Sequence, residues 1–116
     1  MTPISALVLS DGTLVLRPTG PVTITAESDA GLIAAFDEAI ANGQLRIVLD
    51  LSETTQMDSA GLAALVRGWI RVKRARGDVA LAGPAPSIKT MLTITRLITI
   101  FKVSETVDES LELLLP

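Results

Sequence analysis

Short apolar segments alternate with polar breaks along this chain of 116 residues, and their spacing predicts the order of its secondary structure. Two apolar runs, 6–9 and 13–17, flank Asp11-Gly12. An Asp-Gly pair between two such runs predicts a β-hairpin, because both residues tolerate the positive φ that a tight turn needs. Pro and Gly residues at 18–21 then interrupt the ladder, and residues 22–24 are suited to a short third strand.

Apolar residues recur every three or four positions in four later stretches, which is the spacing of amphipathic helices. These stretches run from Ser28-Asp29 to Asn42-Gly43, from the junction at 57–61 to Gly77-Asp78, from Pro84 and Pro86 through Leu92, and from Thr106 onward with Glu109 as its capping-box partner. Strands are expected at 44–51, 79–82 and 97–103, the last partly irregular over 95–101, with a polar loop at 52–56.

Strands that alternate with helices require crossover connections, which are right-handed and give a mostly parallel sheet. No internal repeat or interdomain linker interrupts this order. The sequence therefore predicts a single α/β domain over residues 1–116. We expect a mixed, mostly parallel central β-sheet, an antiparallel hairpin at its N-terminal edge and about four α-helices.

The composition narrows the range of functions. Hydrophobic residues make up 48% of the chain and charged residues 20%, which is typical of a globular domain and not of a disordered tail. The chain has no Cys and no His, so it lacks disulfides, thiolate metal sites, the commonest general base and the commonest metal ligand. We therefore expect no enzyme activity, no catalytic residue, no metal and no cofactor.

Charge and hydropathy restrict the kinds of partner and the cellular location that we expect. A net charge of −3 does not favour nucleic acid, since affinity for phosphate backbones needs surplus Lys and Arg. A signal peptide begins with basic residues, but no basic residue precedes Arg17. The longest apolar stretch, 91–101, contains Arg96 and is about half as long as a membrane span. The sequence therefore predicts a soluble, cytoplasmic protein without membrane insertion.

Three further segments are weaker candidates for sites. Residues 83–90 resemble a phosphate-binding loop, but Ile88 replaces its second Gly and two prolines remove amide donors, so a proline-led helix start is expected. Five basic residues near the end of the second helix form a solvated face or meet an acidic partner: Arg67, Arg71, Lys73, Arg74 and Arg76. Four acidic residues are expected on the solvated side of the last helix: Glu105, Asp108, Glu109 and Glu112.

The junction Met57-Asp58-Ser59-Ala60-Gly61-Leu62, between a buried strand and the second helix, is the most informative segment. Asp58 or Ser59 is expected to cap the helix, as these residue types commonly do. A strand, loop and helix in this order also place the turn at the carboxyl edge of the sheet, where α/β proteins tend to place sites. There the hydroxyl group lies beside unpaired helix N–H groups that tolerate a phosphate. The small pair Ala60-Gly61 is expected to leave the backbone accessible to another protein.

Together with residues 47–52, this junction resembles the strand and Asp-Ser-x-Gly-Leu turn of STAS domains, of the bacterial anti-sigma factor antagonist kind. The similarity covers nearly the whole chain and implies a STAS-like fold and a phosphorylation switch. In that family, a partner anti-sigma factor is itself a serine kinase, holds the ATP, and phosphorylates the Ser that matches Ser59. The unphosphorylated form binds this kinase and so releases a sigma factor, and a serine phosphatase resets the cycle.

The resemblance also implies a set of partner-binding residues: Asp58, Ser59, Ala60, Gly61, Leu62 and Thr23. Thr23 stands where kinase-regulated members carry an acidic residue, and Arg96-Leu97 replaces a common Gly-Leu pair. Alternative phosphoacceptors on the same loop are Ser52, Thr54 and Thr55. The alternative function is a non-phosphorylated STAS scaffold subunit of a lipid-transport ABC complex or a stressosome-like assembly. A small-ligand carrier is a third class, for which the sequence specifies no pocket.

Overall fold

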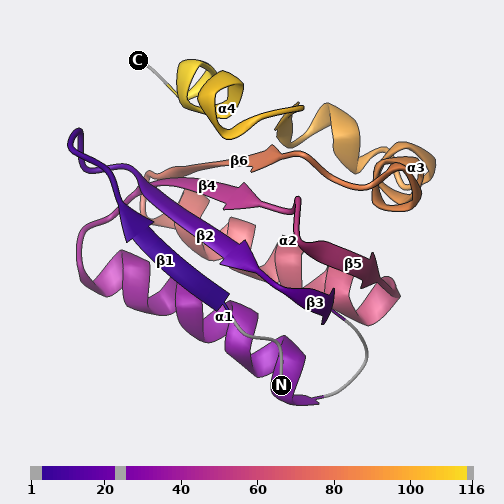
Figure 1. The fold of residues 1–116 in the computed structure, drawn as a ribbon. Coiled ribbons are helices and arrows are strands. Elements are labelled where there is room, and N and C mark those ends of the chain that lie inside the picture. The colour runs from indigo at the N-terminus through magenta and orange to yellow at the C-terminus, as the bar shows by residue number, and fades with distance from the viewer. Residues whose placement is uncertain (1–3, 23–25, 115–116) are drawn as a thin grey trace.

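A five-stranded β-sheet forms the centre of the molecule (Figure 1). The structure is a computed structural model that describes residues 4–22 and 26–114, and the side chains of 21 and 26–30 are not described. In spatial order the strands are β1 (Ile4–Val8), β2 (Leu14–Pro18), β4 (Arg46–Asp50), β6 (Asp78–Ala82) and β7 (Lys102–Ser104). A separate two-stranded sheet consists of β3 (Gly20–Val22) and β5 (Thr54–Met57). The helices are α1 (Ala26–Ala41), α2 (Ser59–Arg74), α3 (Pro86–Ile94) and α4 (Val107–Leu113), with a 3-10 helix, η1 (Leu97–Thr99).

The direction of the strands confirms the predicted fold class. β1 is antiparallel to β2, whereas β2, β4, β6 and β7 are parallel to one another. The hairpin turns at the Asp-Gly pair, where Gly12 has a φ of +89° and the Asp11 carboxylate accepts a 2.9 Å hydrogen bond from the Thr13 amide. The chain therefore has the expected mixed, mostly parallel sheet with an antiparallel hairpin edge and four α-helices.

Helices cover both faces of the sheet. α1 and α2 lie on one face and α4 lies on the other (Figure 1). Neighbouring residues of β4 point to opposite sides: Leu49 packs in the main core with Phe36 of α1 and Leu65 of α2, whereas Val48 packs in a smaller cluster with Leu114. Burial on both faces explains why the sequence of β4 is almost continuously apolar.

One expectation about secondary structure is wrong, and a second holds only in part. The polar segment 52–56, predicted to be a loop, contains most of β5, which pairs in parallel with β3. The predicted strand 97–103 contributes only its last residues to the sheet, because Arg96 turns the chain with a φ of +62° and η1 follows. For β5, the pairing with the remote strand β3 decides the conformation, and local polarity does not report it.

Candidate functional site

The short sheet of β3 and β5 positions the start of α2. Val22 of β3 lies opposite Met57 of β5, and the Val22 carbonyl accepts a 3.3 Å hydrogen bond from the backbone N–H of Asp58. The chain is extended at Asp58, with φ −99° and ψ −176°, and becomes helical at Ser59. The junction predicted from the sequence therefore lies where a strand that is paired on one side turns directly into a helix.

Asp58, and not Ser59, caps this helix. The Asp58 carboxylate oxygen Oδ1 accepts a 2.8 Å hydrogen bond from the Gly61 N–H, and the Asp58 carbonyl accepts the first helical bond from Leu62 at 2.9 Å. Ser59 is the first helical residue and its side chain is exposed. Its hydroxyl group has no hydrogen-bond partner among the residues that the structure describes. The hydroxyl group at this helix start is thus accessible and not occupied by capping.

Gly61 has a packing role that the sequence did not reveal. A Cβ atom at this position would lie 2.2 Å from the carbonyl oxygen of Val22 and 3.1 Å from the Met57 side chain. Gly61 is buried, so the expectation that it leaves the backbone accessible to another protein is wrong. Leu62 is also buried, whereas Asp58 and Ala60 are half-buried. Absence of a side chain here permits β3 to lie directly against the first turn of α2.

The other hydroxyl groups near the junction differ in exposure. Thr54 is 3% exposed and its hydroxyl donates to the Pro18 carbonyl at 3.2 Å, so it is not accessible for modification. Ser52 and Thr55 are exposed, as Ser59 is. Thr23, which the resemblance placed among the partner-binding residues, lies outside the described residues.

A buried aspartate organises the loop between β4 and β5. Asp50, at the end of β4, accepts a 2.9 Å hydrogen bond from the Arg17 side chain and a 3.0 Å bond from the Ser52 N–H. Burial by itself would raise the pKa of Asp50, but the Ser52 hydrogen bonds and the Arg17 ion pair outweigh it and hold the pKa below its usual value. Asp50 was not among the residues expected to form the site, although a charged side chain at the end of an apolar strand is a signal that could have identified it.

The remaining charged groups are mostly paired within the chain. In the basic cluster of α2, Arg71 contacts Asp37 of α1 at 2.5 Å and Lys73 contacts Asp78 at 3.6 Å. These pairs favour a solvated face over a docking surface for an acidic partner.

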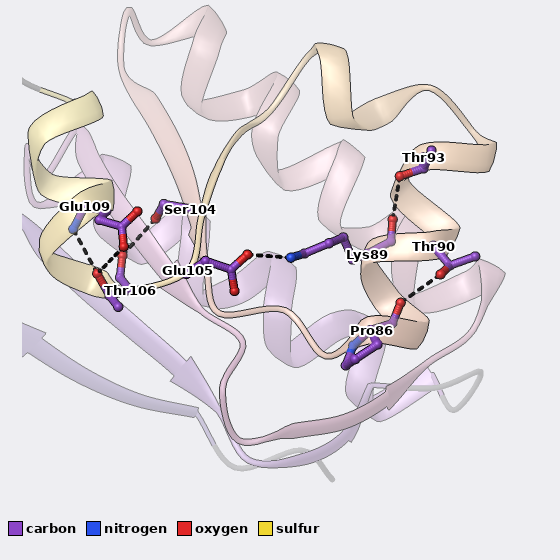
Figure 2. Close-up of polar contacts among 8 residues, drawn as sticks. All are labelled: Pro86, Lys89, Thr90, Thr93, Ser104, Glu105, Thr106 and Glu109. Carbon is purple, nitrogen blue, oxygen red and sulfur yellow. Dashed lines mark hydrogen bonds and ion pairs between the residues drawn. The ribbon is translucent and has the colours of Figure 1, made fainter.

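Two of the four acidic residues near α4, Glu105 and Glu109, also have partners within the chain. Figure 2 shows Glu105 paired with Lys89 of α3 at 2.5 Å, and the Thr106 hydroxyl oxygen accepting from the Glu109 N–H at 3.1 Å, as the capping box predicted. Residues 83–90 form the start of α3, with Pro86 as its first residue, and the Thr90 hydroxyl donates to the Pro86 carbonyl at 2.9 Å. This arrangement is a proline-led helix start, as expected.

Within residues 4–22 and 26–114, no three acidic, His or Cys side chains gather in a way that could hold a metal ion. Over the same residues, no helix has the length and apolar character needed to cross a membrane.

Comparison with known proteins relates this chain to a family. Residues 6–110 match the STAS domain. A candidate anti-sigma factor antagonist of Thermotoga neapolitana is 35% identical over 77 residues, which cover 66% of this chain and 68% of that relative. The crystal structure of a candidate anti-sigma factor antagonist from Thermotoga maritima has a TM-score of 0.83 and 27% identity, over 98% of this chain and 94% of that one. The Bacillus cell fate determinant SpoIIAA, in its phosphorylated form, has a TM-score of 0.73 and 18% identity, over 95% and 97% of the two chains.

Proposed function

This chain belongs to the STAS domain family and to its anti-sigma factor antagonists, and on that premise we propose that it is a switch controlled by phosphorylation of Ser59. Unphosphorylated, the chain binds an anti-sigma factor serine kinase and so releases a sigma factor. Phosphorylation ends this binding, and a serine phosphatase restores it. Anti-sigma factor antagonists are regulatory proteins, and their action depends on a binding surface.

The observation that carries the proposal is the position of the Ser59 hydroxyl group. It is exposed on the first residue of α2, while the neighbouring Asp58 performs the capping. A kinase can therefore reach the hydroxyl group without opening the helix. The fold relative SpoIIAA has been solved in phosphorylated and unphosphorylated forms, which motivates a modification on this fold.

Electrostatic repulsion explains how a phosphoryl group on Ser59 would weaken partner binding. A phosphoryl group adds about 1.5 to 2 negative charges at pH 7, next to the Asp58 carboxylate and on a chain of net charge −3. Two unit charges about 5 Å apart at an effective dielectric constant of about 20 repel by roughly 3 kcal/mol, which is about a hundredfold in affinity. A partner that places an acidic group against this turn is therefore released without any refolding of the chain.

The helix itself tolerates the phosphate. The first turn of a helix has N–H groups without intrahelical partners, and the helix dipole favours negative charge there. Asp58 uses one of these donors, on Gly61, so the phosphate adds to a cap that is already formed. We therefore expect phosphorylation to change the surface charge and to leave the fold unchanged.

The first test is labelling. The chain is incubated with its cognate kinase and ATP and its intact mass is measured. We expect one added phosphate on the wild type and on Ser52→Ala and Thr55→Ala, which remove exposed hydroxyl groups of the neighbouring loop, and none on Ser59→Ala. Equal labelling of Ser59→Ala and wild type would contradict the site. A chain that takes no phosphate and co-purifies with a transporter ATPase would instead support the non-phosphorylated scaffold.

Two further variants of Ser59 separate charge from size in partner binding. Ser59→Asp adds one negative charge and is expected to weaken kinase binding by tenfold or more, in the direction of the phosphate effect. In Ser59→Asn, the new side chain has nearly the same shape as that of Asp but carries no charge, so this variant should bind the kinase within about threefold of the wild-type affinity. Calorimetric titration measures both affinities, and an equal loss for Asp and Asn would mean that bulk, and not charge, ends the interaction.

A further inference from the structure

The outer strand of the sheet is unprotected. β1 pairs with β2 on one side and stands last in the strand order, so no strand among residues 4–22 and 26–114 pairs with its other side, which is called the free edge below. Edge strands of monomeric proteins are usually protected by charged side chains, Pro or bulges. Residues 4–8 contain no charged residue and no Pro, their register with β2 has no bulge, and Leu7 and Val8 are 61% and 52% exposed. This edge is therefore suited to pairing with another strand.

The hairpin turn determines which backbone groups are free. At its closed end the Leu9 N–H donates to the Thr13 carbonyl at 2.8 Å. Hydrogen-bonded pairs alternate along an antiparallel ladder, so the next residues bonded to β2 are Leu7 and Ser5. The intervening residues direct their N–H and C=O groups to the free edge: Ile4, Ala6 and Val8.

The side chains of the same three residues line an apolar groove. The groove has a volume of about 420 Å³ and lies between the β1–β2 hairpin and α1. Its wall on α1 is made largely of small residues, among them Ala34 and Ala35, and Glu38 is the one charged residue among the described residues that line it. A strand added to β1 would therefore place every second side chain beside an apolar surface.

We propose that a second copy of this chain pairs with β1 across a two-fold axis, so that the two five-stranded sheets join into one. A strand that fits this edge must be uncharged and must alternate aliphatic side chains toward the groove, and β1 itself meets both requirements. Antiparallel pairing centred on Ala6 puts Ala6 opposite the partner copy's Ala6, and Ile4 opposite the partner copy's Val8. This register uses all the free N–H and C=O groups of β1.

Charge and size define the strength of this contact. Each copy carries a net charge of −3, yet residues 4–8 carry no charged side chain, so the paired strands themselves add no repulsion between like charges. Two five-residue strands bury less than the roughly 1,200 Å² of a stable interface, so the dimer is weak, with a Kd on the order of 10 to 100 µM. The inference goes beyond the proposed switch and does not depend on it.

Sedimentation equilibrium of the full chain tests the dimer. Between about 5 and 500 µM, which brackets the expected Kd, the weight-average mass of the wild type should rise from the monomer value toward twice that value. Ala6→Lys places two like charges opposite each other and should weaken dimerisation at least tenfold. Val8→Lys places a charged group on the exposed edge, opposite the partner copy's Ile4, and should also weaken dimerisation because that charge would lose water against an apolar side chain. The matched control is Ile94→Lys, a 76% exposed aliphatic position on α3, which should dimerise as the wild type does.

A mixture of two variants tests the register. Ala6→Lys and Ala6→Glu are each expected to be monomeric alone and to associate when mixed in equal amounts, because opposite charges then meet across the axis. Far-UV circular dichroism checks that the variants are folded. A monomeric wild type at the highest concentration would overturn the proposal and leave the edge to a strand of a different protein. Unimpaired dimerisation of both lysine variants, or a mixture that does not associate, would overturn it as well.

Discussion

Asp58 and Ser59, at the start of α2, have different roles: one caps the helix and the other presents an exposed hydroxyl group. The order Asp-Ser in the sequence decides which residue has which role. The residue before the first helical turn supplies the cap, so the Asp58 carboxylate is held against the Gly61 N–H at 2.8 Å. The next residue has helical dihedral angles and its side chain points outward, which leaves the Ser59 hydroxyl group exposed. With the order reversed, a Ser at the cap would have its oxygen occupied by the backbone.

Substitutions of Asp58 separate the effect of its capping hydrogen bond from the effect of its negative charge. Asp58→Ala removes the cap and is expected to lower the free energy of unfolding by about 1 kcal/mol, whereas Asp58→Asn keeps a capping oxygen and should change it by only a few tenths of a kcal/mol. Urea denaturation followed by circular dichroism measures both. If Asn destabilises the chain as much as Ala does, the charge and not the hydrogen bond would be what stabilises this helix start.

Between elements, the close approach of β3 to α2 is the contact that shapes the site. The Val22 carbonyl accepts from the Asp58 N–H and also lies where a Cβ atom of residue 61 would be. The strand and the helix are therefore in backbone contact, and their relative position depends on the absence of one side chain. A rigid first turn keeps Ser59 at a constant place on the surface.

The same substitution at two glycines tests this contact. Gly61→Ala brings a methyl group to 2.2 Å from the Val22 carbonyl oxygen and is expected to lower the free energy of unfolding by about 1 to 3 kcal/mol. Gly31→Ala, inside α1 with no atom within 4 Å of the new Cβ, should raise it by about 0.5 to 1 kcal/mol through helix propensity. Thermal and urea unfolding compare the two, and a neutral Gly61→Ala would mean that β3 moves away without cost.

For the molecule as a whole, two acidic residues at opposite ends of the parallel strands form hydrogen bonds and ion pairs with neighbouring segments of the chain. Asp50 ends β4 and is bonded to Arg17 and Ser52. Asp78 begins β6 and contacts the Lys102 amino group at 2.5 Å. Burial opposes ionisation at Asp78 as at Asp50, but the hydrogen bond from Lys102 and those from neighbouring groups prevail, so both carboxyl groups have a pKa below 3.8.

This lowering predicts how stability depends on pH. A carboxyl group with a lower pKa in the folded chain than in the unfolded chain contributes stability above the unfolded value of 3.8, and that contribution is lost as the pH falls through the folded pKa. The free energy of unfolding should thus fall steeply below about pH 4. Asp50→Asn should lower it at pH 7 and reduce the acid slope. Urea titrations between about pH 7 and pH 2 measure the slopes, and parallel curves for the two chains would contradict the role of Asp50.

Features that depend on neighbours in the sequence were predictable. The hairpin at Asp11-Gly12, the apolar β4 and the Thr106–Glu109 cap all follow from residues within a few positions of one another, and each is present. The helix start at residues 58–59 was predictable for the same reason, although the sequence left open which of the two residues caps. A short-range pattern suffices because turn, strand and cap preferences act within one or two turns of chain.

The sequence by itself determined the order of the helices and of the strands of the five-stranded sheet, and it placed a serine at the first turn of the second helix. Only the tertiary structure decided that 54–57 is a strand and that Gly61 is buried against the Val22 carbonyl. These features require β3 to meet β5, and the two strands are separated by more than thirty residues that include the whole of α1. Such a meeting depends on how the core packs, and a local pattern of polar and apolar residues carries no information about it.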